Sequence, residues 1–76
     1  MEKLAEFVKR KRKQAKLTQE DLASRAGIAL TVIRKIEQDK GNLNLEKVNQ
    51  VLRMFGYELA PVNIKDLNPA NQQQLP

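Results

Sequence analysis

The feature that most constrains the fold is a pair of short helical patterns separated by a single glycine. Thr18 precedes the first pattern, where its hydroxyl can accept from an unpaired backbone N–H, and Asp21 completes a loose capping box. Gly27 is expected to end this helix in the left-handed conformation, which glycine adopts without strain. Three apolar residues between these ends share one helical face: Leu22, Ala23 and Ala26.

A second helical pattern begins directly after Gly27, with Ile33 and Ile36 on its buried side. Two short helices joined by a tight turn are typical of a helix-turn-helix, whose second helix enters the major groove of DNA. An ordinary corner between two core helices has the same spacing. The local pattern alone leaves both interpretations open.

The distribution of charge favours the nucleic-acid interpretation. The 76 residues carry a net charge of +5, and residues 1–42 hold 11 Lys and Arg against 6 Asp and Glu. Residues 43–76 hold 3 of each and are neutral. The excess positive charge therefore accompanies the helical pair, as expected for an end that faces phosphates. One Tyr, two Phe and no Trp give little support to a membrane-surface helix.

The residue inventory argues against an enzyme. The chain has no Cys and no His, which excludes disulfides, the usual zinc sites, thiol nucleophiles and histidine acid–base chemistry. Ser24 has no histidine to activate it, and the carboxylates are scattered. We therefore expect no catalytic residue, metal, cofactor or small-molecule ligand. The apolar runs are too short to span a membrane, so we expect a cytoplasmic protein without a membrane partner.

Residues 2–15 are predicted to form the first helix. The methylene stem of Lys11 fills a gap in its apolar stripe. Five consecutive cations, residues 9–13, lie toward the end of this helix and exceed what the helix dipole alone would favour. We interpret them as phosphate contacts rather than as a solvated face. The stripe consists of Leu4, Phe7, Val8 and Ala15.

A loop over residues 38–44, with Gly41 as its left-handed residue, should lead to a further helix. Asn44 can cap this helix, which is expected to run to about Phe55 and to end at Gly56. Glu37, before the loop, is interpreted as a structural residue that bonds to nearby backbone or to Arg25. The apolar stripe of the helix is predicted to be Leu45, Val48, Leu52 and Phe55.

The C-terminal third divides into a short alternating segment and a polar tail. Residues 57–62 alternate apolar and polar side chains and suit an edge strand, which needs a partner strand from a second subunit. Residues 63–76 have too few apolar side chains to fold alone. We therefore predict one domain over residues 1–62, which binds DNA and dimerises, and a flexible tail over residues 63–76.

With these residues in place, the chain resembles the lambda-repressor-like (Cro/cI, Xre) helix-turn-helix family over roughly residues 4–56. The resemblance implies an all-α bundle of four to five helices, with a helix-turn-helix and a short C-terminal β-strand that pairs across a dimer. Many relatives carry glycine in the loop before Leu17, where this chain has Lys16. The landmarks are residues 17–23, Ala26-Gly27-Ile28, Ile33 and Ile36-Glu37.

A narrower resemblance is to the HipB-like antitoxins of toxin–antitoxin modules. It depends on Phe7-Val8, residues 46–52 and residues 55–59. Such antitoxins are dimers that repress their own operon and bind a HipA-like Ser/Thr kinase toxin. The resemblance therefore implies three partners for this chain, which are double-stranded DNA with an inverted-repeat operator, a second copy of itself, and a HipA-like kinase.

The resemblance assigns the groove residues by position, while the phosphate and dimer contacts follow mainly from the basic run and from the alternating segment. The residues expected at the bases and groove are Gln19, Ala29, Leu30, Thr31, Arg34 and Lys35. The residues expected at phosphates are Lys9, Arg10, Arg12, Lys13, Thr18 and Lys40. The residues expected at the dimer interface are Phe55, Tyr57, Leu59 and Val62. Many relatives have polar residues at the positions of Ala29, Leu30 and Val32. The alanine and leucine of this chain can contact a thymine methyl, but they cannot read hydrogen-bonding groups on the bases.

The leading hypothesis is a dimeric repressor, and specifically an antitoxin of this type. A phage-type or restriction-modification regulator shares the DNA argument but has no kinase partner. A protein–protein adaptor is the alternative of another class, and the concentration of charge in residues 1–42 argues against it.

Overall fold

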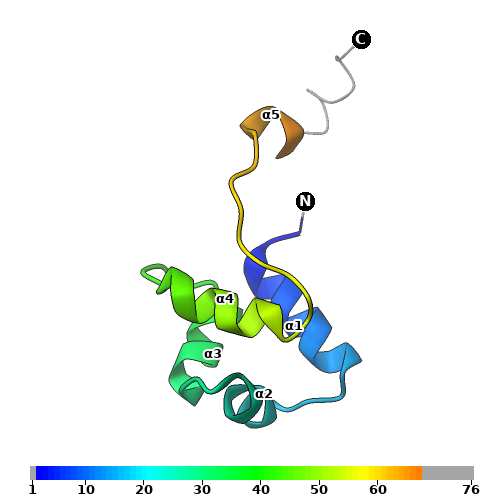
Figure 1. Cartoon of the computed structure of the whole chain (residues 1–76), viewed down its shortest axis with the longest axis vertical. Coiled ribbons are helices and arrows are strands. Elements are labelled where there is room, and N and C mark those ends of the chain that lie inside the picture. The colour runs from blue at the N-terminus through cyan, green and yellow to red at the C-terminus, as the bar shows by residue number, and fades with distance from the viewer. Residues whose placement is uncertain (1, 68–76) are drawn as a thin grey trace.

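Four helices form the body of the molecule, and a fifth, single-turn helix stands apart from them (Figure 1). The computed structural model describes residues 2–67, and in this part of the chain all regular secondary structure is helical. The predicted all-α class and the number of helices are therefore confirmed. The helices are α1 (Leu4–Gln14), α2 (Gln19–Ala26), α3 (Leu30–Glu37), α4 (Leu45–Arg53) and α5 (Ile64–Leu67).

Both predicted ends of α2 are confirmed. The Thr18 hydroxyl accepts from the backbone N–H of Asp21 at 3.0 Å, and the Asp21 carboxylate accepts from the Thr18 N–H at 3.0 Å. This capping box satisfies two donors at the helix start. At the other end, Gly27 is left-handed with φ 70°. α3 follows after only two further residues, so the helix-turn-helix geometry is set by local chemistry.

Each of the four body helices ends on the same hydrogen-bonded turn around a left-handed residue. In each turn, the backbone N–H that follows this residue donates to the carbonyl five positions earlier, as in a Schellman motif. The four bonds are Leu17 to Arg12 at 3.1 Å, Ile28 to Ala23 at 2.9 Å, Lys40 to Lys35 at 3.2 Å and Tyr57 to Leu52 at 3.0 Å. The left-handed residues are Lys16, Gly27, Asp39 and Gly56.

The prediction that Gly41 is the left-handed residue of the loop after α3 is wrong. The positive φ angles there belong to Asp39, at 57°, and Asn42, at 63°. Asp and Asn tolerate this conformation because their short polar side chains can bond locally. The position of the left-handed residue is set by the end of α3, where the Asp39 N–H donates to the Ile36 carbonyl at 3.2 Å. The left-handed residue is therefore Asp39, two positions before Gly41.

The core draws on all four body helices. Its almost fully buried side chains are Val8, Leu22, Ile33, Ile36, Val48 and Val51. All of them except Val51 were predicted.

Two predicted core positions are wrong. Leu45 is 69% exposed because it starts α4 at the edge of the apolar stripe, which is centred on Val48, Val51 and Leu52. Ala15 is exposed because it lies beyond the last residue of α1. Lys11 is half-buried, and its Nζ lies 5.3 Å from the centre of the Tyr57 ring.

Residues 57–62 run along the body without forming a strand. The Tyr57 ring meets the Phe7 ring edge-on, with centroids 4.7 Å apart, and the Leu59 N–H donates to Asn49 Oδ1 at 2.7 Å. A strand needs a neighbouring backbone to bond with, and one chain supplies none here. Pairing across a dimer therefore stays a prediction.

The region predicted as a tail begins with a helical turn that the sequence analysis did not anticipate. α5 occupies residues 64–67, and all four of these residues are exposed. The remainder of the predicted tail, residues 68–76, lies outside the described residues.

Lys16→Gly is expected to stabilise the protein. A non-glycine residue in the left-handed region costs roughly 1–2 kcal/mol, and the greater freedom of glycine in the unfolded chain offsets about 0.4–1 kcal/mol of the relief. A net gain of up to about 1 kcal/mol should appear in urea unfolding. Lys16→Ala is the matched control, because it removes the same charge but keeps the Cβ atom. Equal stability of the two variants would contradict the strain at Lys16.

Candidate nucleic-acid interface

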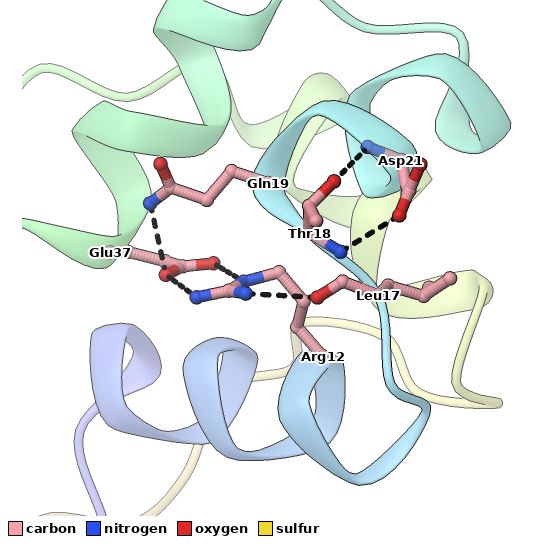
Figure 2. A network of polar contacts seen from close by, with 6 residues as sticks. All are labelled: Arg12, Leu17, Thr18, Gln19, Asp21 and Glu37. Carbon is pink, nitrogen blue, oxygen red and sulfur yellow. Dashed lines mark hydrogen bonds and ion pairs between the residues drawn. The ribbon is translucent and has the colours of Figure 1, made fainter.

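A buried ion pair joins α1 to α3 (Figure 2). The Arg12 guanidinium donates to both carboxylate oxygens of Glu37, from Nε at 2.7 Å and from Nη2 at 2.9 Å. The Arg12 side chain is 12% exposed and the Glu37 side chain 2%. The predicted structural role of Glu37 holds, but its predicted partners, nearby backbone or Arg25, are wrong. Glu37 lies beside Ile33 and Ile36 on the inner face of α3, which α1 covers, so the guanidinium in reach is that of Arg12.

The same pair also fixes α2 and the connection that leads into it. Gln19 Nε2 donates to Glu37 Oε1 at 3.2 Å, and Arg12 Nη1 donates to the Leu17 carbonyl at 2.9 Å. Figure 2 shows Glu37 between the side chains of Arg12 and Gln19. It also shows the capping box of Thr18 and Asp21 at the start of α2. Three helices thus converge on one carboxylate, which fixes the outer face of α3 relative to the start of α2.

The ionisation of both partners is set by this contact. Burial alone would raise the pKa of Glu37, but hydrogen bonds from Arg12 and Gln19 and the charges of Arg12 and Lys9 outweigh it. The pKa of Glu37 is therefore lowered from its ordinary value of 4.5. The hydrogen bond to Glu37 in turn raises the pKa of Arg12. The pair stays charged at neutral pH.

The outer face of α3 carries the residues predicted to contact bases. Thr31, Arg34 and Lys35 are exposed, as is Ala29, the residue that precedes the helix. Leu30 is half-buried and packs against the core, so only part of its side chain reaches the surface. Hydroxyl, guanidinium and ammonium groups are available on this face for hydrogen bonds to base edges and phosphates.

A shallow hollow lies where this face of α3 meets the start of α2. It brings together five residues predicted to contact DNA, Arg12, Thr18, Gln19, Leu30 and Arg34, beside Leu17 and Glu20. The Thr18 hydroxyl accepts from Asp21 and keeps its own proton to donate. Gln19 donates one side-chain N–H to Glu37, which leaves its amide oxygen and its second N–H for other hydrogen bonds.

The basic run of residues 9–13 is divided around α1, because successive helical residues point about 100° apart. Lys9 and Lys13 are exposed, and Lys40 is exposed at the end of α3. Arg10 donates to Glu2 at 2.9 and 2.7 Å and lies 5.4 Å from the centre of the Phe7 ring. Arg10 is therefore held on the same side of α1 as Phe7.

Arg12 is not placed as the sequence analysis predicts. Its guanidinium lies inside the fold, where Glu37 and the Leu17 carbonyl occupy three of its nitrogens, so a role at phosphates is replaced by a structural one. A signal for this was present in the sequence. Ala5, Val8 and Arg12 follow one another at spacings of three and four, so Arg12 continues the buried stripe of α1.

None of the helices in residues 2–67 is long and apolar enough to cross a membrane. No cluster of three or more Asp and Glu that could hold a metal ion occurs in the same range.

Comparison with known protein families gives one match. A family model described as helix-turn-helix, of the Xre/Cro/cI type, matches residues 8–62, which run from within α1 through α4 and the segment after it. No curated protein and no solved structure matches the chain.

The Arg12–Glu37 pair should show strong coupling in a mutant cycle. Glu37→Leu leaves a buried guanidinium unpaired and should cost about 3–5 kcal/mol in urea unfolding, whereas the double variant Arg12→Met, Glu37→Leu should cost far less, and Arg12→Met alone completes the cycle. A depressed pKa stabilises the folded state above the unfolded value of 4.5, and this contribution is lost as the pH falls through the lower folded value. The wild type should therefore lose more stability between pH 6 and pH 3 than the double variant does. Additive effects and equal acid sensitivity would contradict the pair's role.

Proposed function

The chain belongs to the helix-turn-helix family, a family of DNA-binding domains without enzymatic activity, and on this basis we propose that it is a repressor that binds a specific operator. The observation that carries the proposal is the exposed face of α3. Thr31, Arg34 and Lys35 lie on it, while Glu37 holds the opposite face against Arg12 and Gln19. A rigidly held helix with polar groups on its free side suits insertion into a major groove.

In this proposal, Arg34 and Lys35 contact base edges, and Thr31 and Ala29 contact bases through their methyl groups. Leu30 touches the groove with the part of its side chain left at the surface. Gln19 contacts the edge of the groove with the amide oxygen that Glu37 leaves free.

Phosphate binding is assigned to exposed groups around this face. Lys9, Lys13, Lys40 and the Thr18 hydroxyl are the proposed contacts, and Arg10 reaches a phosphate only by leaving Glu2. The surplus of five positive charges in residues 1–42 supports this assignment, because phosphate neutralisation supplies most of the affinity for duplex DNA.

We also propose that the repressor is a dimer that reads an inverted repeat. Tyr57 is 47% exposed and Val62 51% exposed, while Phe55 and Leu59 are half-buried beside them. These four residues are the proposed interface. A two-fold dimer would present its two recognition helices to half-sites about one helical turn apart.

The finer proposal is that the chain is an antitoxin that binds a HipA-like Ser/Thr kinase. It depends on the resemblance of Phe7-Val8 and residues 46–52 and 55–59 to HipB-like antitoxins. If α3 faces DNA and residues 55–62 face a second copy, such a kinase can use the flanks of α1 and α4 and whatever part of residues 63–76 the second copy leaves uncovered.

DNA binding is tested by selecting an operator from a random duplex library and titrating it against random DNA at several salt concentrations. A dimer that neutralises about 6–8 phosphates should give a slope of log affinity against log salt of roughly −5 to −7. Arg34→Ala or Lys35→Ala should lower the operator preference by about 1–3 kcal/mol.

Lys13→Ala is the matched control on another exposed cation. It should weaken operator and random DNA equally and reduce the slope by about one unit for each phosphate that is no longer neutralised. An operator-to-random ratio that is unchanged by the α3 variants would refute the placement of α3 in the groove.

The antitoxin proposal is tested by co-expressing the chain with the product of the neighbouring gene, followed by a pull-down with and without residues 63–76. A kinase-like protein should co-purify with the full chain. If no neighbouring product is retained, the plain regulator replaces the antitoxin. Equal retention without residues 63–76 would remove only the role of that segment.

A further inference from the structure

The exposed large hydrophobic side chains of residues 2–67 are confined to one half of the chain. Among the described residues, the exposed large hydrophobic side chains all lie at or after the start of α4: Leu45, Met54, Tyr57, Val62, Ile64 and Leu67. α1 to α3 contribute none of them. The half that carries the net positive charge thus has its large hydrophobic side chains covered, whereas the electrically neutral half exposes several of them.

Two of these exposed regions are a groove on the body and an arm that projects from it. One is an apolar groove on the body, lined by Leu45, Asn49, Leu59, Ala60 and Pro61. The other is an arm, residues 62–67, which leaves the body and ends in α5 (Figure 1). The arm carries Val62, Ile64 and Leu67, which are 51%, 79% and 38% exposed.

The arm does not turn back into the groove of its own chain. Pro61 forms part of the groove wall, and the chain leaves the groove directly after it. Asn63 then begins α5, because its side chain accepts from the Lys65 N–H at 2.9 Å and its carbonyl from the Asp66 N–H at 2.9 Å. These bonds form the turn of α5 directly after the groove, and Ile64 remains exposed outside the groove.

We propose that the arm of one copy docks in the Leu45–Leu59–Pro61 groove of a second copy, and reciprocally. This proposal rests on the dimer of the proposed function and extends its interface to Leu45, Ile64 and Leu67. The occupant is a second copy because residues 43–76 carry three positive and three negative charges, so two such halves approach without net repulsion, and because groove and arm lie on the same chain. Neutral apolar surface has no attraction for DNA phosphates.

Site-directed cross-linking tests this arrangement directly, because the chain has no cysteine. Ile64→Cys protein is mixed with a size-tagged Leu45→Cys protein, and a short bismaleimide is added. The 64–45 product should exceed by at least tenfold the product formed between Ile64→Cys and Ser24→Cys, whose thiol lies exposed on α2 in the body. The mixture reports only links between chains, which excludes an arm that folds back on its own groove.

A second measurement uses a variant that leaves the body untouched. Ile64→Ser should raise the dimer dissociation constant at least tenfold in analytical ultracentrifugation, whereas Lys65→Ser, at the next exposed position, should leave it unchanged. A dimer that is insensitive to Ile64→Ser and gives no excess 64–45 product would overturn arm exchange while leaving the proposed repressor intact. A chain that binds its operator but stays monomeric at tens of micromolar would also overturn it. Loss of operator binding in the wild type would instead refute the proposed function, which the cross-linking does not measure.

Discussion

The contact between Arg12 and Glu37 is the interaction on which the candidate DNA-binding surface depends. It holds α3 against α1, and through Gln19 and the Leu17 carbonyl it also holds the start of α2. A buried ion pair is a weak source of net stability, because desolvation cancels much of the attraction. Its value here is geometric, since two charges that must meet allow few relative positions of three short helices.

The division of the chain into two halves follows from what each half is expected to contact. Residues 1–42 combine a covered core with an excess of exposed cations, and the described residues after them combine charge neutrality with exposed apolar side chains. Phosphates attract the first kind of surface, and water disfavours the second. A small domain with a marginal core gains stability if that apolar surface is buried against a second copy.

Much of the fold could be predicted from local chemistry. The capping box of Thr18 and Asp21, the left-handed Gly27 and the buried Ile33 and Ile36 all appear as expected, because caps and stripes depend on neighbours within one or two turns. The left-handed residue after α3 was misplaced on Gly41. The backbone takes that conformation where the helix ends, and Asp39 tolerates it.

The sequence by itself therefore determined the four body helices, the capping box and left-handed end of α2, the class of fold and the uneven charge, since each depends on residue type and short spacing. Only the tertiary structure decided which cations remain available. Arg10 and Arg12 belong to the same basic run, yet one pairs with Glu2 on the surface and the other with Glu37 inside. Positions two apart on a helix face different neighbours, and here one neighbour precedes the same helix while the other comes from α3. The partner of Glu37 was decided in the same way, because opposite charges 25 residues apart meet only when the helices have packed.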